Sequence, residues 1–160
     1  MSNLCVAGET QAPPRVVVVG LASCFGCQLQ ITNAEAHLLE VLGQIDMRYW
    51  QLTSSEPMPE EFDVAVIEGA VTTREGMETV QRVREKAAKV IAIGSCATTA
   101  GIPGMAQPDF ESRITEVYED APSACGEMVS PRAVSEFIKV DYEVRCCPID
   151  PYNFIDILQR

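Results

Sequence analysis

Short runs of apolar, mostly branched residues recur along the chain, separated by turns and by helical patterns. The runs at 15–20, 62–68 and 90–94 are almost continuously apolar, which is typical of strands buried on both faces of a parallel sheet. A further strand is predicted at 47–52. Because predicted strands and helices alternate, we expect an α/β fold: a doubly wound parallel sheet of the flavodoxin type with right-handed crossovers.

Three segments carry helix signals. Residues 29–42 have apolar side chains at helical spacing and are followed by Gly43, a common residue after a helix end. The inward-facing residues expected there are Leu29, Ile31, Ala34, Leu38, Leu39 and Leu42. A second helix is predicted at 74–88, and its expected inward stripe is Met77, Val80, Val83, Arg84 and Ala87. A third is predicted over 152–158, because Asp150 and Pro151 are typical of the start of a helix.

The remaining segments lack a clear period. Residues 1–14 are predicted to form a tail that lies on the surface or on a partner. Residues 100–131 are predicted to be mostly irregular, with a short helix at 110–118, and 134–144 to be extended or helical. We find no internal repeat, and expect a single domain over 15–160 with an irregular C-terminal part.

Composition narrows the possible functions. The 160-residue chain has 12 Lys and Arg against 23 Asp and Glu, a net charge of −11. Because neutralising phosphates takes clustered basic residues, we expect no nucleic-acid partner. With 47% hydrophobic and 22% charged residues the composition is that of a folded globular chain. No apolar run approaches the ~20 residues of a membrane span, so none is expected.

The chain has seven cysteines, at positions 5, 24, 27, 96, 125, 146 and 147. The first residues show no basic segment followed by an apolar one, so we expect no signal peptide and a reducing, cytoplasmic location. Cysteines in such a compartment are more often metal ligands or catalytic groups than disulfide partners. Cys5 and Cys125, which belong to no motif, are expected to be small packing residues.

Thiols follow several of the predicted strands. Cys24 and Cys27 come after the first strand, Cys96 comes after the strand at 90–94, and Cys147 or its neighbour Cys146 offers a fourth thiol. Because the carboxyl ends of parallel strands meet at one edge of a sheet, we expect these thiols to lie together. Four thiolates can hold an iron–sulfur cubane or a zinc ion. Spacing alone leaves both open.

Other interpretations exist for single pieces of this pattern. Cys24-x-x-Cys27 alone also suits a thioredoxin-like redox pair. A flavodoxin-like FMN carrier would need a phosphate-binding loop after the first strand, and residues 21–26 are poorly suited to that. Glu68 ends a buried strand at the same edge, so it is either a polar group of the site or an exposed strand-end acid. His37 is expected to be a packing or surface residue.

Taken in order, the motifs form a joint pattern. They are Cys24-x-x-Cys27, Glu68-Gly69, Gly94-Ser95-Cys96 followed by Gly101 and Pro103, and Cys147-Pro148. This pattern resembles that of the small subunits of [NiFe] hydrogenases, over residues 15–160. The resemblance implies that Cys24, Cys27, Cys96 and Cys147 ligate one proximal [4Fe-4S] cluster. It also implies that Glu68 lies beside that cluster, as a hydrogen-bonding group at the subunit interface or a proton relay.

The resemblance also implies partners. The Ni-Fe centre is expected in a separate large subunit, because this chain lacks the two further CxxC pairs that the centre requires in the family. The chain ends soon after Cys147, and this short form resembles the small subunits of cytoplasmic hydrogenases that pass electrons to NAD- or ferredoxin-linked modules. The expected function is electron transfer within such a hydrogenase.

One departure and two alternatives accompany this hypothesis. Cys146 stands where the family usually has glycine, so the backbone beside the cluster is expected to differ. The related iron–sulfur subunit of complex I has adjacent cysteines in its first ligand loop, whereas here the adjacent pair comes last. The alternative from another class is a zinc-stabilised binding module without a redox role.

Overall fold

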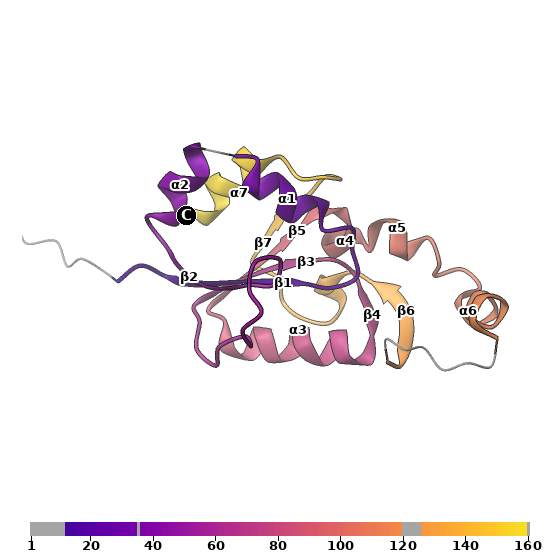
Figure 1. Cartoon of the computed structure of the whole chain (residues 1–160). Helices are drawn as coiled ribbons and strands as arrows, with labels where there is room; N and C mark the ends of the chain where they lie inside the picture. Colours follow the sequence, from indigo (N-terminus) through magenta and orange to yellow (C-terminus); the bar gives the residue numbers. More distant parts are fainter. Residues whose placement is uncertain (1–11, 35, 120–125, 160) are drawn as a thin grey trace, which may run out of the picture.

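The computed structural model describes residues 12–34, 36–119 and 126–159. Its central sheet contains β1 (Arg15–Gly20), β2 (Asp46–Trp50), β3 (Val64–Glu68), β5 (Lys89–Ile93) and β7 (Tyr142–Val144). These five strands are all parallel and lie in the order β2-β1-β3-β5-β7 (Figure 1). Counted along the chain, the order is the 2-1-3-4-5 of flavodoxin-like sheets. The predicted fold class is therefore confirmed.

Helices cover both faces of the sheet. On one face lie α1 (Gly26–Thr32), α2 (Ala36–Leu42) and α7 (Pro151–Leu158), and on the other lies α3 (Arg74–Lys86) (Figure 1). Successive strand residues point to opposite faces, so β1 and β3 contribute to two separate cores. One core holds Val16, Val18, Val66, Trp50 and Phe154, and the other holds Val17, Val19, Ile67, Val80 and Val83. This double burial explains why the strands are apolar at nearly every position.

The single helix predicted at 29–42 is wrong in one respect, because the structure has two helices there. α1 ends at Thr32, and the Thr32 hydroxyl donates to the Leu29 carbonyl at 2.7 Å, a local bond that competes with helix continuation. The break changes the phase of the inward stripe. Leu39 is therefore exposed and Val41 is buried instead, and Leu29, in α1 before the break, is also exposed against expectation.

The other two predicted helices are confirmed together with their starts. In α3 the Thr73 hydroxyl accepts a hydrogen bond from the Gly76 amide at 3.0 Å, and Val80, Val83 and Ala87 are buried as expected. In α7 the Asp150 carboxylate accepts from the Tyr152 amide at 2.9 Å. Both caps satisfy amides of the first turn that have no partner inside the helix.

The segment predicted to be mostly irregular contains more structure than expected. After α4 (Gly94–Thr99) the chain forms α5 (Gly101–Gly104) and α6 (Phe110–Tyr118), and the latter matches the predicted short helix. β6 (Met128–Arg132) then pairs antiparallel with β4 (Val71–Thr73), which lies outside the predicted strands. We call the described residues 101–119 and 126–132 the excursion. It extends away from the sheet in Figure 1, and neither α5 nor α6 has a buried residue.

A 3-10 turn, η1 (Val134–Glu136), follows the excursion, and the chain then enters β7. Just before β7, Asp141 accepts a hydrogen bond from the Val90 amide at 2.8 Å and pairs with Arg84 of α3 at 2.6 Å. The pair fastens α3 to the edge of the sheet. No helix within the described ranges is long and apolar enough to cross a membrane.

Candidate functional site

The carboxyl edge of the sheet brings four of the predicted thiols together from three strands. Cys24 and Cys27 follow β1, Cys96 lies in α4 directly after β5, and Cys147 follows β7. The backbone ties two of these segments, because the Ser95 amide donates to the Cys146 carbonyl at 2.9 Å. Sequence-distant cysteines therefore share one edge, as the strand pattern predicted.

The thiols are close enough to influence one another's titration. Burial raises the pKa of the Cys27 thiol to about 12, and the Glu68 carboxyl and Cys147 add to this rise. The pKa of the Cys96 thiol is also raised, first by burial and then by Cys147, Cys24 and Glu68. Each effect has the same cause: a thiolate is disfavoured where water is excluded and other negative groups are near. Such a set of thiols gains most from a positive centre that neutralises them together.

Two glycines, which have no side chain, leave space for the sulfur atoms of Cys27 and Cys96. Gly94 has a φ of 81°, and a Cβ placed on it would overlap the Cys27 sulfur. Gly101 has a φ of 49°, and a Cβ there would come within 3.2 Å of the Cys96 sulfur. A larger residue at either position would be strained and would displace a thiol. The glycines of the predicted motifs thus have a local steric reason.

Glu68 lies within the site and is almost completely buried, with 1% of its surface exposed. Its Oε1 accepts a hydrogen bond from the Cys27 amide at 3.1 Å, while its Oε2 is enclosed without a partner among the described residues. Phe25, at the N-cap of α1, makes no side-chain cap. The Glu68 carboxyl from β3 therefore takes over that task for the first turn. The alternative of an exposed strand-end acid is wrong.

Gln28 is a buried polar residue that the sequence analysis missed. It is 0% exposed, and its Oε1 accepts a hydrogen bond from the Trp50 indole at 2.7 Å. Its Nε2, like Glu68 Oε2, is enclosed without a partner in the described structure. A signal was available, because Gln28 precedes the buried Ile31 and Ala34 by steps of three residues. A polar residue within an apolar stripe indicates a buried hydrogen bond.

The other sequence-predicted residues lie elsewhere. Cys5 and Cys125 fall outside the described residues. His37 is exposed and makes an edge-to-face contact with Tyr152, with ring centroids 5.5 Å apart, so the expected surface role is confirmed. Within the described ranges, no three side chains of Cys, His, Asp or Glu form a group that would hold a single metal ion.

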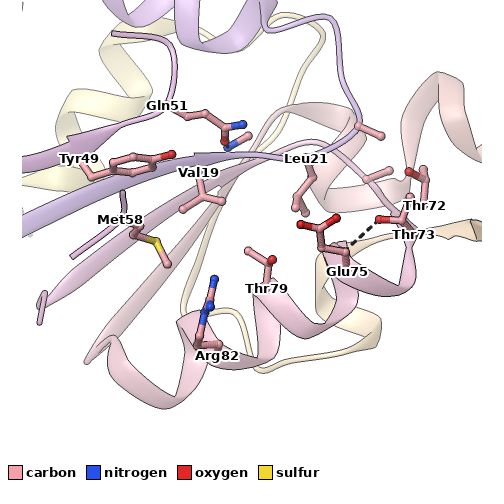
Figure 2. Close-up of a pocket in the computed structure, with 14 residues that line it drawn as sticks. Val19, Leu21, Tyr49, Gln51, Met58, Thr72, Thr73, Glu75, Thr79 and Arg82 are labelled. Atoms are coloured by element: carbon pink, nitrogen blue, oxygen red, sulfur yellow. Dashed lines mark hydrogen bonds between the residues drawn. The ribbon is translucent and has the colours of Figure 1, made fainter. Parts of the chain in front are cut away.

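A pocket of about 520 Å³ has no cysteine among its lining residues (Figure 2). It opens between the carboxyl ends of β1 and β2 and the helix α3, and Tyr49, Thr79 and Arg82 are among its lining residues. None of the predicted site residues lines it. The candidate site is thus the thiol-bearing edge rather than this hollow.

A comparison with protein families decides which group of proteins the chain falls in. The model of the family described as NADH ubiquinone oxidoreductase, 20 Kd subunit, matches residues 24–160, from the first candidate ligand onward. The chain belongs to this family. Membership of this family is compatible with both the complex I alternative and the hydrogenase hypothesis. Individual relatives must therefore distinguish the two.

Several relatives of this chain are named as hydrogenase subunits. A polypeptide of the F420-non-reducing hydrogenase vhu of Methanocaldococcus jannaschii is 30% identical over 156 residues, covering 90% of this chain and 54% of that protein. The delta polypeptide of the NAD-reducing hydrogenase HoxS of Cupriavidus necator is 26% identical over 160 residues, covering 91% and 77%. The chain thus spans about half to three quarters of the length of these relatives. The resemblance to hydrogenase small subunits is confirmed.

Solved structures similar to this chain are also hydrogenase chains. A chain of an NAD+-reducing [NiFe]-hydrogenase in the H2-reduced state superposes with a TM-score of 0.78 at 26% identity, with 92% of each chain covered. A chain of the [NiFeSe] hydrogenase from Desulfovibrio vulgaris Hildenborough matches at a TM-score of 0.64 and 19% identity, covering 94% of this chain and 59% of that one. The second likeness shows the fold alone.

Hydrogenase small subunits generally carry iron–sulfur clusters, and the residues present fit such a group. The donors at the edge are all thiols, which is the set that iron–sulfur clusters take. At the position where the family usually has glycine, Cys146 adopts a φ of 113°, in the region that favours glycine. A non-glycine residue in that region costs about 1–3 kcal/mol, which the surrounding structure must offset.

Proposed function

We propose that this chain is the electron-transfer subunit of a cytoplasmic [NiFe] hydrogenase, and that it holds one [4Fe-4S] cluster through Cys24, Cys27, Cys96 and Cys147. The observation that carries the proposal is the meeting of these four thiols at the carboxyl edge beside the buried Glu68. When bound, the cluster would supply one-electron transfer. The similarity to subunits of named hydrogenases supports the reaction class.

The chain's own residues would hold and shield the ligands. Burial keeps Cys27 away from water, and Gly94 leaves space for its sulfur. Cys24 and Cys147 are exposed, so a partner that covers this edge would complete the enclosure. We propose the large subunit with the Ni-Fe centre as that partner, and an NAD- or ferredoxin-linked module as the electron acceptor or donor. The naming of one relative as NAD-reducing supports the first kind of module.

Metal content tests the ligand set. The chain purified anaerobically is expected to contain about four irons and four sulfides, with an EPR signal on reduction. Cys96→Ser should lose or convert the cluster, whereas the matched Cys146→Ser, at an exposed and non-ligand cysteine, should keep it. Cys125→Ser should also keep it. Stoichiometric zinc without iron would instead establish the zinc-stabilised module.

Co-purification tests the assignment to hydrogenase. A tagged chain expressed in its native cells should bring down a nickel-containing partner with hydrogen-oxidising activity, and fractionation should find it in the cytoplasm. Recovery of a quinone reductase without nickel would favour the complex I alternative. Recovery of neither would remove the proposed function, whatever metal the chain holds.

A further inference from the structure

Two fully buried polar side chains, one on α1 and one at the end of β3, each have one atom without a hydrogen-bond partner among the described residues. They are Gln28, at its Nε2, and Glu68, at its Oε2. Buried polar atoms in folded proteins are nearly always paired with protein or with ordered water. Leaving one unpaired costs about 1–3 kcal/mol, and here two would be unpaired at one site. The simplest way to satisfy both atoms is a hydrogen-bonded link between the two side chains.

Several contacts put the two side chains in one place. Glu68 is the β-ladder neighbour of Gly20, and Gln28 Nε2 lies 3.2 Å from where a Cβ of Gly20 would be. The Phe25 ring fills the rest of that space, 2.6 Å from the same point. Glu68 Oε1 already receives the amide of Cys27, the residue before Gln28. Both groups therefore lie around the slot that Gly20 leaves open.

The chemistry of the pair is complementary. Indole nitrogen is a donor only, so the bond from Trp50 determines that Gln28 presents its oxygen to Trp50. Its two amide hydrogens must then point the other way. A carboxylate oxygen is an acceptor only, which is what those hydrogens require. No direct bond joins them in the structure, and one enclosed water molecule can connect a buried donor to a buried acceptor.

We propose that Gln28 is a positioning residue: its amide donates to Glu68 Oε2 through one buried water, and thereby links Trp50 at the end of β2 to the first turn of α1. The chain of contacts runs from the Trp50 indole through Gln28 and Glu68 to the Cys27 amide. Its effect is to fix the position of the Cys27 backbone, and so of the Cys27 sulfur beside Gly94. Gln28 touches no reacting group, and it acts through Glu68.

A charge swap tests the link between the two side chains. Gln28→Glu places two buried carboxylates on either side of the shared water, where like charges repel. Glu68→Gln leaves two neutral amides there, so each single variant loses the pairing of an amide with a carboxylate. Each single variant is expected to lower the folded-to-unfolded equilibrium constant by about 10- to 100-fold. The double variant Gln28→Glu with Glu68→Gln restores one donor and one acceptor, and should recover at least tenfold of the combined loss. Gln44→Glu, at an exposed position, is the matched control and should change little.

If the loss in the double variant equals the product of the two single fold-losses to within about twofold, the two side chains are not coupled and the proposal is wrong. The measurement is urea unfolding of the full chain, followed by the fluorescence of Trp50, which is the only tryptophan. It reads folding rather than metal content or turnover. A failure here therefore differs from a failure of the proposed function, which metal content and co-purification decide.

A milder variant keeps the proposal testable should the swap variants not fold. Gln28→Met fills a similar volume without hydrogen bonding, so a role in packing alone predicts normal exchange of the Cys27 amide. A positioning role predicts at least tenfold faster hydrogen exchange at that amide, together with a shift in Trp50 emission. Unchanged exchange and emission would rule out the positioning role. Iron content of the same variant, compared with wild type, then shows whether the thiols depend on the link.

Discussion

The central sheet and the excursion differ in what holds them in place. β3 is buried at four of its five positions, and its side chains enter both cores. α6 is as regular a helix, yet it has no buried residue, and Val117 is 69% exposed. Local pattern was enough to predict that α6 is a helix. Regular structure and stability thus have different sources, because most helical stability in proteins comes from packing rather than from propensity.

Hydrogen exchange should show the largest contrast between these two regions. Amides of β3 are expected to exchange only when the whole chain unfolds, at a free energy of about 5–15 kcal/mol. Amides of α6 should exchange through local opening at a few kcal/mol or less, since no buried contact opposes it. Exchange of the full chain read by mass spectrometry or NMR checks this. Equal protection in α6 and β3 would mean that the excursion unfolds only with the core.

Truncating one aliphatic side chain in each region sharpens the same contrast. Ile67→Ala removes a fully buried side chain from β3 and should lower the free energy of unfolding by about 2–5 kcal/mol. Val117→Ala in α6 should change it by no more than about 0.5 kcal/mol. Urea unfolding with unchanged m-values measures both. A comparable loss from Val117→Ala would contradict the assignment of stability to the sheet.

The ion pair that fastens α3 to the sheet should matter less than the core and more than surface pairs. Arg84→Leu leaves Asp141, with a side chain only 13% exposed, without its guanidinium partner. We expect a loss of about 1–3 kcal/mol. Arg145→Leu removes a partner of Glu143 from a position where the arginine is 72% exposed, and should cost at most about 0.5 kcal/mol. Thermal unfolding at low and moderate salt separates the two.

The smallest effect concerns stability in acid, through an ion pair at the amino ends of β1 and β3. Hydrogen bonds from Arg15 lower the pKa of Asp63 from 3.8 to about 2. Because the folded-state pKa is the lower one, this contribution is present above about pH 4 and is lost as the pH falls toward 2. The Asp63 side chain is 42% exposed, so the contribution should stay below about 1 kcal/mol. The stability difference between wild type and Asp63→Asn should therefore shrink between about pH 5 and pH 2.5.

The site shows the same division between local pattern and packing. The strand pattern predicts that Cys24, Cys27 and Cys96 share one edge, because parallel strands must end together. The choice of Cys147 as the fourth thiol came from the resemblance. The burial of Glu68 could be expected only as one of two options. The spacing of Gln28 from Ile31 and Ala34 could have indicated its burial, but not its partner Trp50, which is 22 residues away on β2. Hydrogen bonds across that distance depend on the register of β1 with β2, which no local pattern encodes.

By itself, the sequence determined the parallel sheet of the flavodoxin type, the α3 and α7 helices, and the edge where thiols gather. These follow from period, β-branched runs and capping residues, all of which act over a few neighbouring positions. Only the tertiary structure decided the break between α1 and α2, the pairing of β4 with β6 and the glycine-like angle of Cys146. The pairing and the Cys146 angle depend on contacts between distant segments, which exist only once the sheet has brought those segments together. The break follows a local bond at Thr32 that the apolar period does not register.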